Sequence, residues 1–409
     1  MSAAAAPAGD LRDPPDNFAE AGDRLHDVVA KLVGSTDFGE SDYLPGLCAL
    51  LRSIEYDTRL NQRGRRDAWG RLIDVLAARA RALQSMARNP GFERTAIRKP
   101  IVITGVPRTG TTALHKLMAV DPQLQGLESW LLSAPMPRPP RSTWESHPQF
   151  IRTAEEIADR YALSPGARAA HSRAAEEVDE CLAILAQGFV SNYWASCWMV
   201  PSYDAWWQTQ SERPAYRHLH RVVQLIGSNE PERRWLLKNP GHIANLDLLF
   251  EIFPDARVIQ THRDPAKAIP SLTALLGQFI APVESGRDAL RGRIIAHRET
   301  EKWARAVHDC DIVRRARPDQ VLDVVHADFH RDPIGIVRRI YDFCELALSD
   351  DVEAAMRARI SGDPERRHGA HRYDVADYDL TEEDIRQRFG DYVERYGLRP
   401  EKAPEKGKA

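Results

Sequence analysis

The sequence has 409 residues, of which 43% are hydrophobic and 28% are charged, proportions that are ordinary for a folded globular protein. Its 56 Lys and Arg residues against 59 Asp and Glu residues give a net charge of −3, which argues against nucleic acid as a partner. The 5 Cys residues lack CxxC spacing, so the sequence favours a reduced, cytoplasmic protein without a disulfide framework or a zinc site. No apolar run reaches the roughly 18 residues that a membrane span requires.

The two ends of the chain differ in composition from what lies between them. Residues 1–16 are rich in Ala, Pro, Gly and Asp without the pattern of a secretory signal, and they predict a disordered leader. Residues 401–409 predict a disordered tail. Residues 17–98 carry apolar side chains at three- and four-residue spacing, which predicts a region made of helices, the first of which ends at Gly34. Such a region is typical of a helical packing layer or of an oligomerisation arm, so a homo-oligomer is one of the alternatives that the sequence allows.

Residues 99–400 predict a domain in which strands alternate with helices. Its core strands are predicted from short apolar runs at residues 101–104, 235–237, 257–261 and 321–325. This alternation is typical of a parallel α/β sheet flanked by helices. Such sheets bind ligands at the carboxyl ends of their strands. A glycine-bounded loop, Lys238 and Arg263 each follow a predicted strand, so we expect them at that edge.

The segment Gly105–Thr112 reads GVPRTGTT and lies between the first predicted strand and an apolar-periodic helix. This order is that of a phosphate-binding loop, in which backbone N–H groups and a helix N-terminus hold an anion. Thr111 stands where a nucleotide triphosphatase has its Lys, so a triphosphate would be held poorly. Gly110, the Thr hydroxyls and the cation Arg108 suit one charged group on the 5′ end of a nucleotide, such as a phosphosulfate.

Four short strings carry a resemblance to a known family. Residues 107–112 (PRTGTT) and 263–271 (RDPAKAIPS) resemble the loop and the 3′-phosphate motif of sulfotransferases that use 3′-phosphoadenosine 5′-phosphosulfate (PAPS). Residues 126–128 (GLE) and 238–240 (KNP) look like motifs of the bacterial branch that is akin to tyrosylprotein sulfotransferases. The resemblance covers roughly residues 100–395. It implies a P-loop-like α/β fold and an enzyme that uses PAPS and needs no metal.

The resemblance also implies roles for individual residues. The sulfuryl group and the 5′-phosphate would be held by the loop and one strand-end cation, namely Arg108, Thr109, Gly110, Thr111, Thr112 and Lys238. Arg263 and Ser271 would hold the 3′-phosphate, which separates PAPS from ATP, and a late basic loop with Arg367 and Gly369 would cover it. A P-loop kinase or NTPase is the alternative that the missing Lys disfavours. A non-catalytic nucleotide-binding protein is the alternative that the intact set of residues disfavours.

The acceptor must lose a proton when it attacks sulfur, so a general base is needed. Lys238 and Arg108 would stabilise the charge that develops during transfer. Glu128 follows a short apolar segment that predicts the second core strand, and it is the first candidate for the base. His242, shortly after Lys238, is the second candidate, and a third reading has neither residue as the base.

An insertion at about residues 135–230 is predicted to bind the acceptor. It holds an aromatic cluster that includes Tyr193, Trp194, Trp198 and Trp206. These side chains either line a pocket for a small, lipophilic or aromatic acceptor with a hydroxyl, less readily an amine, or belong to the core. The acidic residues 176–180 are predicted to form a solvated helical face, with contact to a cationic acceptor as the alternative.

Overall fold

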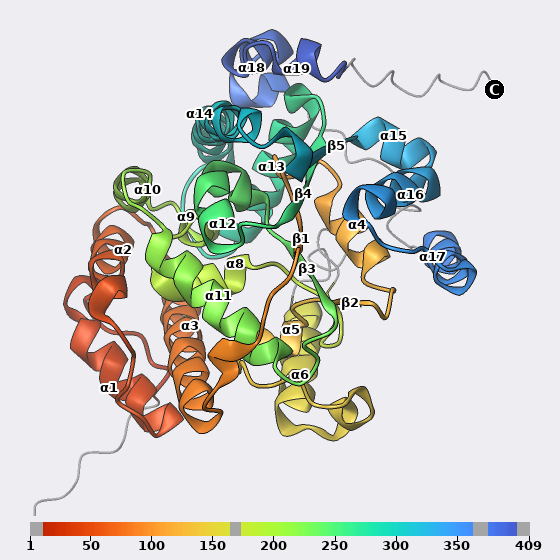
Figure 1. Cartoon of the computed structure of the whole chain (residues 1–409). Helices are drawn as coiled ribbons and strands as arrows, with labels where there is room; N and C mark the ends of the chain where they lie inside the picture. Colours follow the sequence, from red (N-terminus) through yellow and green to blue (C-terminus); the bar gives the residue numbers. More distant parts are fainter. Residues whose placement is uncertain (1–10, 164–172, 363–374, 399–409) are drawn as a thin grey trace, which may run out of the picture.

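The computed structural model of the chain describes residues 11–163, 173–362 and 375–398, and its centre is a parallel sheet (Figure 1). Within these ranges the sheet has five strands in the order β2-β3-β1-β4-β5, and each pair runs parallel. The strands are β1 (Ile101–Gly105), β2 (Leu124–Gln125), β3 (Arg234–Lys238), β4 (Arg257–His262) and β5 (Val321–Val325). The predicted parallel α/β sheet flanked by helices is therefore confirmed.

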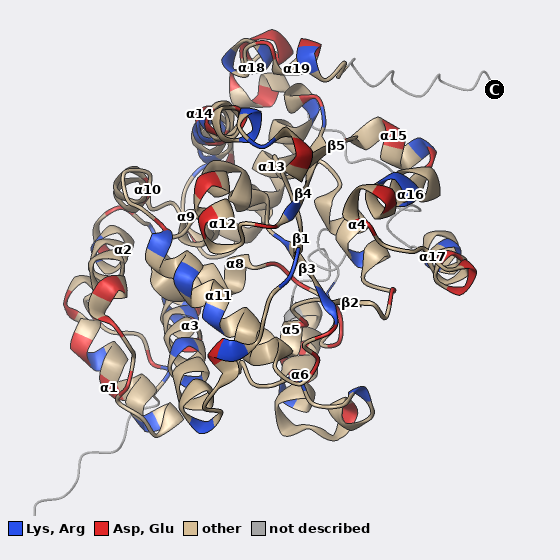
Figure 2. Cartoon of the chain, viewed as in Figure 1, with Lys and Arg blue, Asp and Glu red and all other residues tan. Residues whose placement is uncertain are grey.

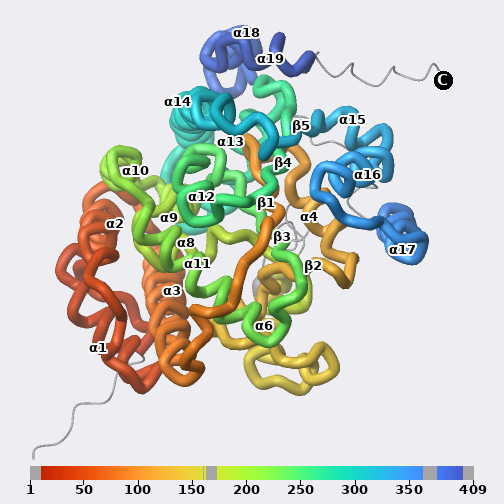
Figure 3. The backbone as a smooth tube through the Cα atoms, viewed as in Figure 1, coloured from red at the N-terminus to blue at the C-terminus, as the bar shows by residue number. Residues whose placement is uncertain are grey.

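Helices cover both faces of the sheet, as a parallel sheet requires (Figures 1 and 3). Side chains along β1 alternate between two hydrophobic clusters, with Ile101 and Ile103 in one and Val102 in the other. The helices on the Ile103 face include α4 (Thr111–Met118), α16 (Pro333–Cys344) and α17 (Asp350–Gly362). Those on the Val102 face include α11 (Arg213–Gly227), α12 (Leu246–Ile252), α13 (Pro265–Ile280) and α14 (Asp288–Arg315).

The strand order brings the ends of β1, β3 and β4 together at one edge of the sheet. β1 lies between the other two, with Ile103 paired with Lys238 and Gly105 paired with Thr261. The helix that follows β1 lies on one face of the sheet, and the helix that follows β3 lies on the other. This is the arrangement at which open α/β sheets bind ligands. The loop after β1, Lys238 and the residues after β4 therefore meet.

The N-terminal helices lie beside the sheet, shown from red to orange in Figure 1. They are α1 (Gly22–Val33), α2 (Leu44–Tyr56) and α3 (Gln62–Arg88). The first ends at Gly34, whose left-handed backbone (φ 70°) is what a helix stop uses, as the sequence predicts. Apolar residues of all these helices share one hydrophobic cluster with residues 186–207. The core therefore crosses the boundary that the sequence suggests after residue 98.

The predicted disordered leader, residues 1–16, is wrong for its described part, residues 11–16. The Arg65 guanidinium donates to the Pro15 carbonyl at 2.7 Å, and the Trp69 indole N–H donates to the Leu11 carbonyl at 3.2 Å. Side chains of α3 thus satisfy backbone carbonyls of this segment and hold it in place. Residues 1–10 and the predicted tail, 401–409, lie outside the described residues.

The long insertion and the C-terminal part are built from shorter helices. They include α5 (Ser129–Leu132), α6 (Pro148–Leu163), α8 (Leu182–Leu185), α9 (Asn192–Cys197), α10 (Pro201–Trp207), α15 (His326–Arg331), α18 (Glu382–Arg388) and α19 (Tyr392–Arg395). Lys and Arg are interspersed with Asp and Glu over the helices on both sides of the sheet (Figure 2). Within the described ranges, no helix combines the length and the apolar character that crossing a bilayer requires.

The acidic residues 176–180 lie in a non-helical segment that runs along the ends of the strands. The Cys181 N–H donates to the Lys238 carbonyl at 2.9 Å, so the segment is fixed to the end of β3. The predicted solvated helical face is wrong. Glu177 and Glu180 instead form ion pairs with cations from distant parts of the chain, which a helical periodicity in the sequence does not reveal.

Candidate active site

The loop after β1 has a backbone that only a few residue types tolerate. A Cβ at Gly105 (φ 143°) would lie 2.5 Å from the Thr261 carbonyl oxygen, so this position requires glycine. Gly110 (φ 92°) has a left-handed backbone and directly precedes α4. The Thr109 hydroxyl donates to the Val106 carbonyl at 2.7 Å and lies 2.6 Å from the Thr261 hydroxyl. These contacts pin the loop to β4 and leave the first N–H groups of α4 at its mouth.

Predicted donor residues from different elements meet around this loop. The Arg108 Nε donates to the Ser271 hydroxyl of α13 at 3.1 Å. An Arg263 Nη1–H donates to the Arg108 carbonyl, also at 3.1 Å. The Lys238 ammonium donates to the Thr112 hydroxyl at 3.1 Å. The structure therefore brings together the loop and the ends of β3 and β4, with their predicted cations on one cradle.

A further set of contacts fixes the backbone beside Arg263. The Asp264 carboxylate accepts from the Ala266 N–H at 3.0 Å and so caps the start of α13. It also accepts from the Arg386 guanidinium of α18 at 2.7 Å. Asp264 is buried, and Arg386 compensates its charge. The residue next to Arg263 is thus held from two sides, which limits how far Arg263 itself can move.

Sequence reasoning missed the carboxylate that pairs with Lys238. The Lys238 side chain is only 1% exposed and forms an ion pair with Glu180, which is 20% exposed. A buried ammonium requires such a partner. Burial and then the nearby Lys238 charge lower the pKa of His115 on α4 to about 3. The acidic run in the sequence was the available signal, but it did not indicate which carboxylate reaches the cradle.

The first candidate for the general base, Glu128, lies in a different buried ion pair. Its Oε2 accepts from the Arg138 guanidinium at 3.0 Å and 3.2 Å. Burial raises the pKa of Glu128, and the Arg138 charge opposes that rise. Arg138 also donates to the Gln125 side chain and to the Gly126 carbonyl. Arg138 therefore holds this carboxylate just beyond the end of β2. That strand is shorter than the sequence predicts.

The second candidate, His242, is fully buried after β3. Its Nδ1 shares a hydrogen bond of 2.7 Å with the Tyr216 hydroxyl of α11. Its Nε2 has no hydrogen-bond partner among the described residues. Burial lowers the pKa of His242 to about 3, so the ring is neutral at physiological pH. Two other predicted site residues, Arg367 and Gly369, lie outside the described residues.

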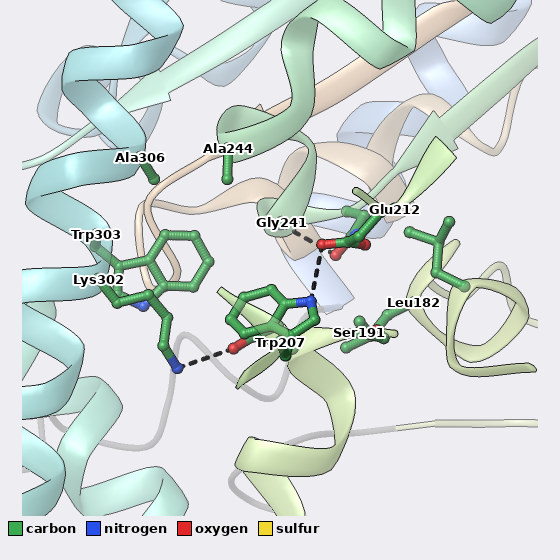
Figure 4. A pocket seen from close by; sticks show the side chains of 12 residues that line it. Leu182, Ser191, Trp207, Glu212, Gly241, Ala244, Lys302, Trp303 and Ala306 are labelled. Atoms are coloured by element: carbon green, nitrogen blue, oxygen red, sulfur yellow. Dashed lines mark hydrogen bonds between the residues drawn. The ribbon is translucent and has the colours of Figure 1, made fainter. Parts of the chain in front are cut away.

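A narrow pocket lies between the aromatic insertion, α14 and the segment after β3 (Figure 4). Its apolar walls come from Leu182, Leu185, Trp207, Trp303, Ala244 and Ala306. The Trp207 indole N–H and the Asn245 side-chain amide donate to Glu212 at 3.1 Å and 3.0 Å. Burial raises the pKa of Glu212 to about 7. The Lys302 ammonium donates to Asn192 and to Glu299, each at 3.0 Å. The pocket thus has aromatic walls and a few polar groups.

Four of the aromatic residues that the sequence suggested for this pocket do not line it. Trp194 and Trp198 are fully buried and stack on each other, with ring centroids 5.8 Å apart. Tyr193 and Trp206 are partly buried and pack against the same cluster, which the N-terminal helices share. Of the two readings, the core reading describes their position. Trp207, which belongs to the same predicted aromatic cluster, is the aromatic residue of this segment that reaches the pocket.

Comparison with known proteins agrees with the cradle at the sheet edge. A family model described as "Sulfotransferase family" matches residues 100–350, which include the loop, Lys238, Arg263 and Ser271. The chain belongs to the sulfotransferase family. It is therefore an enzyme that transfers a sulfuryl group, and membership implies PAPS as the donor. The glycine cradle and the linked Arg and Ser donors fit the anionic ends of that nucleotide.

Relatives and solved structures from mycobacteria support this assignment. Omega-hydroxy-beta-dihydromenaquinone-9 sulfotransferases Stf3 of Mycobacterium tuberculosis (strain CDC 1551 / Oshkosh) and Mycobacterium bovis are 24% identical over 316 residues, 73% of this chain and 75% of theirs. The crystal structure of sulfotransferase STF1 from Mycobacterium tuberculosis H37Rv matches with a TM-score of 0.82 and 35% identity, covering 91% of this chain and 99% of STF1. Sulfotransferase STF9 from Mycobacterium avium has a TM-score of 0.83 and 24% identity, covering 92% and 97%, and it shares the fold.

Proposed function

We propose that this sulfotransferase moves the sulfuryl group of PAPS to a hydroxyl of a small, lipophilic acceptor, with an amine as the less favoured acceptor group. The observation that carries the proposal is the linked set of donors, in which Arg108 contacts Ser271 and Arg263 contacts the backbone of Arg108. PAPS has two anionic ends, and permanently charged Arg side chains suit both. A cradle with donors on two sides therefore fits a nucleotide that has two anionic ends better than a nucleotide whose phosphates all lie at one end.

In this proposal each part of the cradle has its own task. Gly110 and the backbone N–H groups at the start of α4 bind the 5′ end, with hydroxyls from Thr111 and Thr112, whereas the predicted donor Thr109 is buried and fixes the loop instead. Arg108 and Lys238 lie beside the sulfuryl oxygens and offset the charge that develops during transfer. Arg263 and Ser271 hold the 3′-phosphate, with Arg367 and Gly369 as predicted further contacts. The acceptor oxygen then attacks sulfur in line with the leaving 5′-phosphate, so that catalysis depends mainly on positioning.

We place the acceptor in the aromatic pocket of Figure 4. That pocket is lined by Asn239, the residue after Lys238, and the apolar part of its walls comes from Leu, Trp and Ala side chains. Pockets of this composition suit apolar molecules that carry one polar group. The mycobacterial relatives are named for a lipophilic acceptor with an omega-hydroxyl, omega-hydroxy-beta-dihydromenaquinone-9. A small-molecule lipophilic alcohol or phenol is the acceptor class that these observations favour.

We assign the enzyme to the reducing environment of the cytoplasm. All 5 Cys residues lie among the described residues, and all are free thiols. Secreted proteins commonly pair their cysteines, whereas cytosolic proteins keep them reduced.

Thermal unfolding with nucleotides tests the donor assignment. We expect 3′,5′-bisphosphoadenosine at 100 times its Kd to stabilise the protein by about 2.7 kcal/mol, and AMP or ATP with Mg²⁺ to have little effect. Arg263→Ala should weaken bisphosphoadenosine binding by about 10- to 100-fold, since a charged hydrogen bond contributes about 1.5–3 kcal/mol, and leave AMP binding unchanged.

Arg213→Ala is the matched control for that variant, because Arg213 pairs with Glu251 on the surface of α11. Mass spectrometry of lipophilic alcohols and phenols incubated with PAPS then detects the transferred sulfuryl group. Equal stabilisation by AMP and bisphosphoadenosine, or no transfer to any lipophilic hydroxyl, would contradict the proposed function.

A further inference from the structure

Among the described residues, the ion pair between Lys238 and Glu180 brings a carboxylate into contact with the predicted sulfuryl site. Lys238 is the last residue of β3 and also contacts Thr112 of the loop. Glu180 reaches it because the next residue, Cys181, is hydrogen-bonded through its N–H to the Lys238 carbonyl. The backbone contact thus fixes the origin of the Glu180 side chain. The carboxylate is positioned by the fold, and it is not a chance surface partner.

Residues next to the pair line two pockets, although Glu180 itself lines neither of them. A narrow polar pocket is lined by Thr112, Lys238 and Asp179, and it borders the loop. The aromatic pocket is lined by Asn239, which directly follows Lys238. It is also lined by Leu182, which lies two residues after Glu180. Along the chain, Glu180 therefore lies between Asp179, which lines the pocket beside the donor loop, and Leu182, which lines the pocket that we assign to the acceptor. A group that removes a proton from the acceptor must lie at this boundary.

The other carboxylates near the two pockets have partners other than Lys238. Asp179 forms an ion pair with Arg173, and Glu212 accepts from Trp207 and Asn245. Glu128 is paired with Arg138 in the core and is only 6% exposed. Glu177 forms ion pairs with Lys116 and Arg359 on the Ile103 face of the sheet. Within the described residues, Glu180 is the carboxylate that contacts Lys238.

We propose that Glu180 is the general base that takes the proton from the acceptor hydroxyl. This inference rests on the proposed function. PAPS binding brings sulfuryl oxygens to Lys238, and the ammonium exchanges Glu180 for them. The released carboxylate then accepts the hydroxyl proton. The acceptor oxygen forms its bond to sulfur, the bond between sulfur and the 5′-phosphate oxygen breaks, and 3′,5′-bisphosphoadenosine leaves with the bonding electron pair.

Glu180→Gln in the full-length chain tests this role. General-base catalysis contributes about 10²-fold or more to a rate, so kcat should fall by that factor. Binding of 3′,5′-bisphosphoadenosine, followed by thermal shift, should be retained or become tighter, because an anion beside the 5′ end has been removed. A residue with a purely structural role would lower kcat and nucleotide binding together.

Glu176→Gln is the matched control, since Glu176 is exposed in the same segment and loses the same charge. Its kcat should stay within about twofold of wild type.

The outcomes separate the two proposals. Normal bisphosphoadenosine binding with undiminished turnover of Glu180→Gln would overturn the role of Glu180 alone. The role of Glu180 would also be overturned if Glu128→Gln abolished turnover at normal stability while Glu180→Gln did not. Failure of the wild-type enzyme to bind bisphosphoadenosine would overturn the proposed function and this inference with it.

Discussion

The donor cradle and the acceptor pocket are built in different ways. The cradle consists of residues at the ends of adjacent strands, so that β1, β3 and β4 fix Gly110, Lys238 and Arg263 relative to one another. The acceptor pocket is assembled from helices that are far apart in the chain, with Leu182 from α8, Trp207 from α10 and Trp303 from α14. The geometry of the donor cradle depends on strand register, and the geometry of the acceptor pocket depends on the packing of helices.

This difference has a physical consequence. A strand end can shift only if the register of the sheet changes, so the cradle is preorganised for charge stabilisation. Helix packing can adjust by small side-chain movements, so the acceptor pocket can change its specificity without damage to the donor site. Variants on the two sides should therefore fail in different measurements, and the following changes test that separation.

The largest effect is expected from Lys238→Met. Met fills the same buried space, but it removes the ammonium beside Thr112 and the sulfuryl site. Loss of one fixed donor at a developing negative charge lowers kcat by about 10²- to 10³-fold in other enzymes. We expect this loss with the KM for the acceptor nearly unchanged, measured by steady-state kinetics with a lipophilic alcohol.

Lys99→Met is the control for that experiment, because Lys99 pairs with Glu345 at an exposed position. It should leave kcat unchanged. If Lys238→Met raised mainly the KM for the acceptor, the separation between a donor side and an acceptor side would be wrong.

A smaller effect, on stability, is expected from Glu212→Gln in the acceptor pocket. Burial raises the pKa of Glu212 from 4.5 to about 7, so the folded protein holds this proton more tightly than the unfolded chain. The contribution of the protonated Glu212 to the free energy of unfolding is therefore fully present below pH 4.5. It is lost as the pH rises through about 7. Gln keeps an acceptor for Trp207 and Asn245 and has no proton to lose.

We expect Glu212→Gln to match wild type near pH 4.5 and to be more stable at pH 8 by up to about 3 kcal/mol, at about 1.4 kcal/mol per pKa unit. Urea unfolding at both pH values measures this. Glu251→Gln should show no gain at pH 8, because Arg213 holds the pKa of Glu251 below its usual value. A gain that is equal at both pH values would contradict the titration of Glu212.

The fold could be predicted because its strands consist of short apolar runs, which are typical of the buried strands of a parallel sheet. β1, β3, β4 and β5 lie where those runs are, and the helix stop at Gly34 follows from one residue type with a left-handed backbone. The second strand ends at Gln125, before the predicted Glu128. The segment over 176–180 was not predictable from periodicity, because distant cations and not its own pattern determine its conformation.

The site could be predicted in part for the same reason. Loop glycines and strand-end cations have local signals, so the sequence predicts Arg108, Lys238 and Arg263, and the structure brings them together. Glu180 and Trp207 lie in an acidic run and an aromatic cluster that the sequence shows, but no local signal distinguishes them from the other members. An acidic run and an aromatic cluster each offer several equivalent side chains, and only tertiary packing determines which of them reaches a pocket.

The smallest effect, and a direct test of the cradle, is expected from Gly110→Ala. Gly110 has φ 92°, and a Cβ there would lie 3.2 Å from the His326 ring. Left-handed backbone costs an L-residue about 1–2 kcal/mol, which unfolding measures. Gly34→Ala at φ 70° is the matched control, because a Cβ there meets nothing within 4 Å. Both variants should lose similar stability, but only Gly110→Ala should weaken bisphosphoadenosine binding, since only Gly110 lies where the 5′ end is held. Equal nucleotide binding by the two variants would mean that the loop backbone does not contact the donor, and the cradle would have to be placed elsewhere.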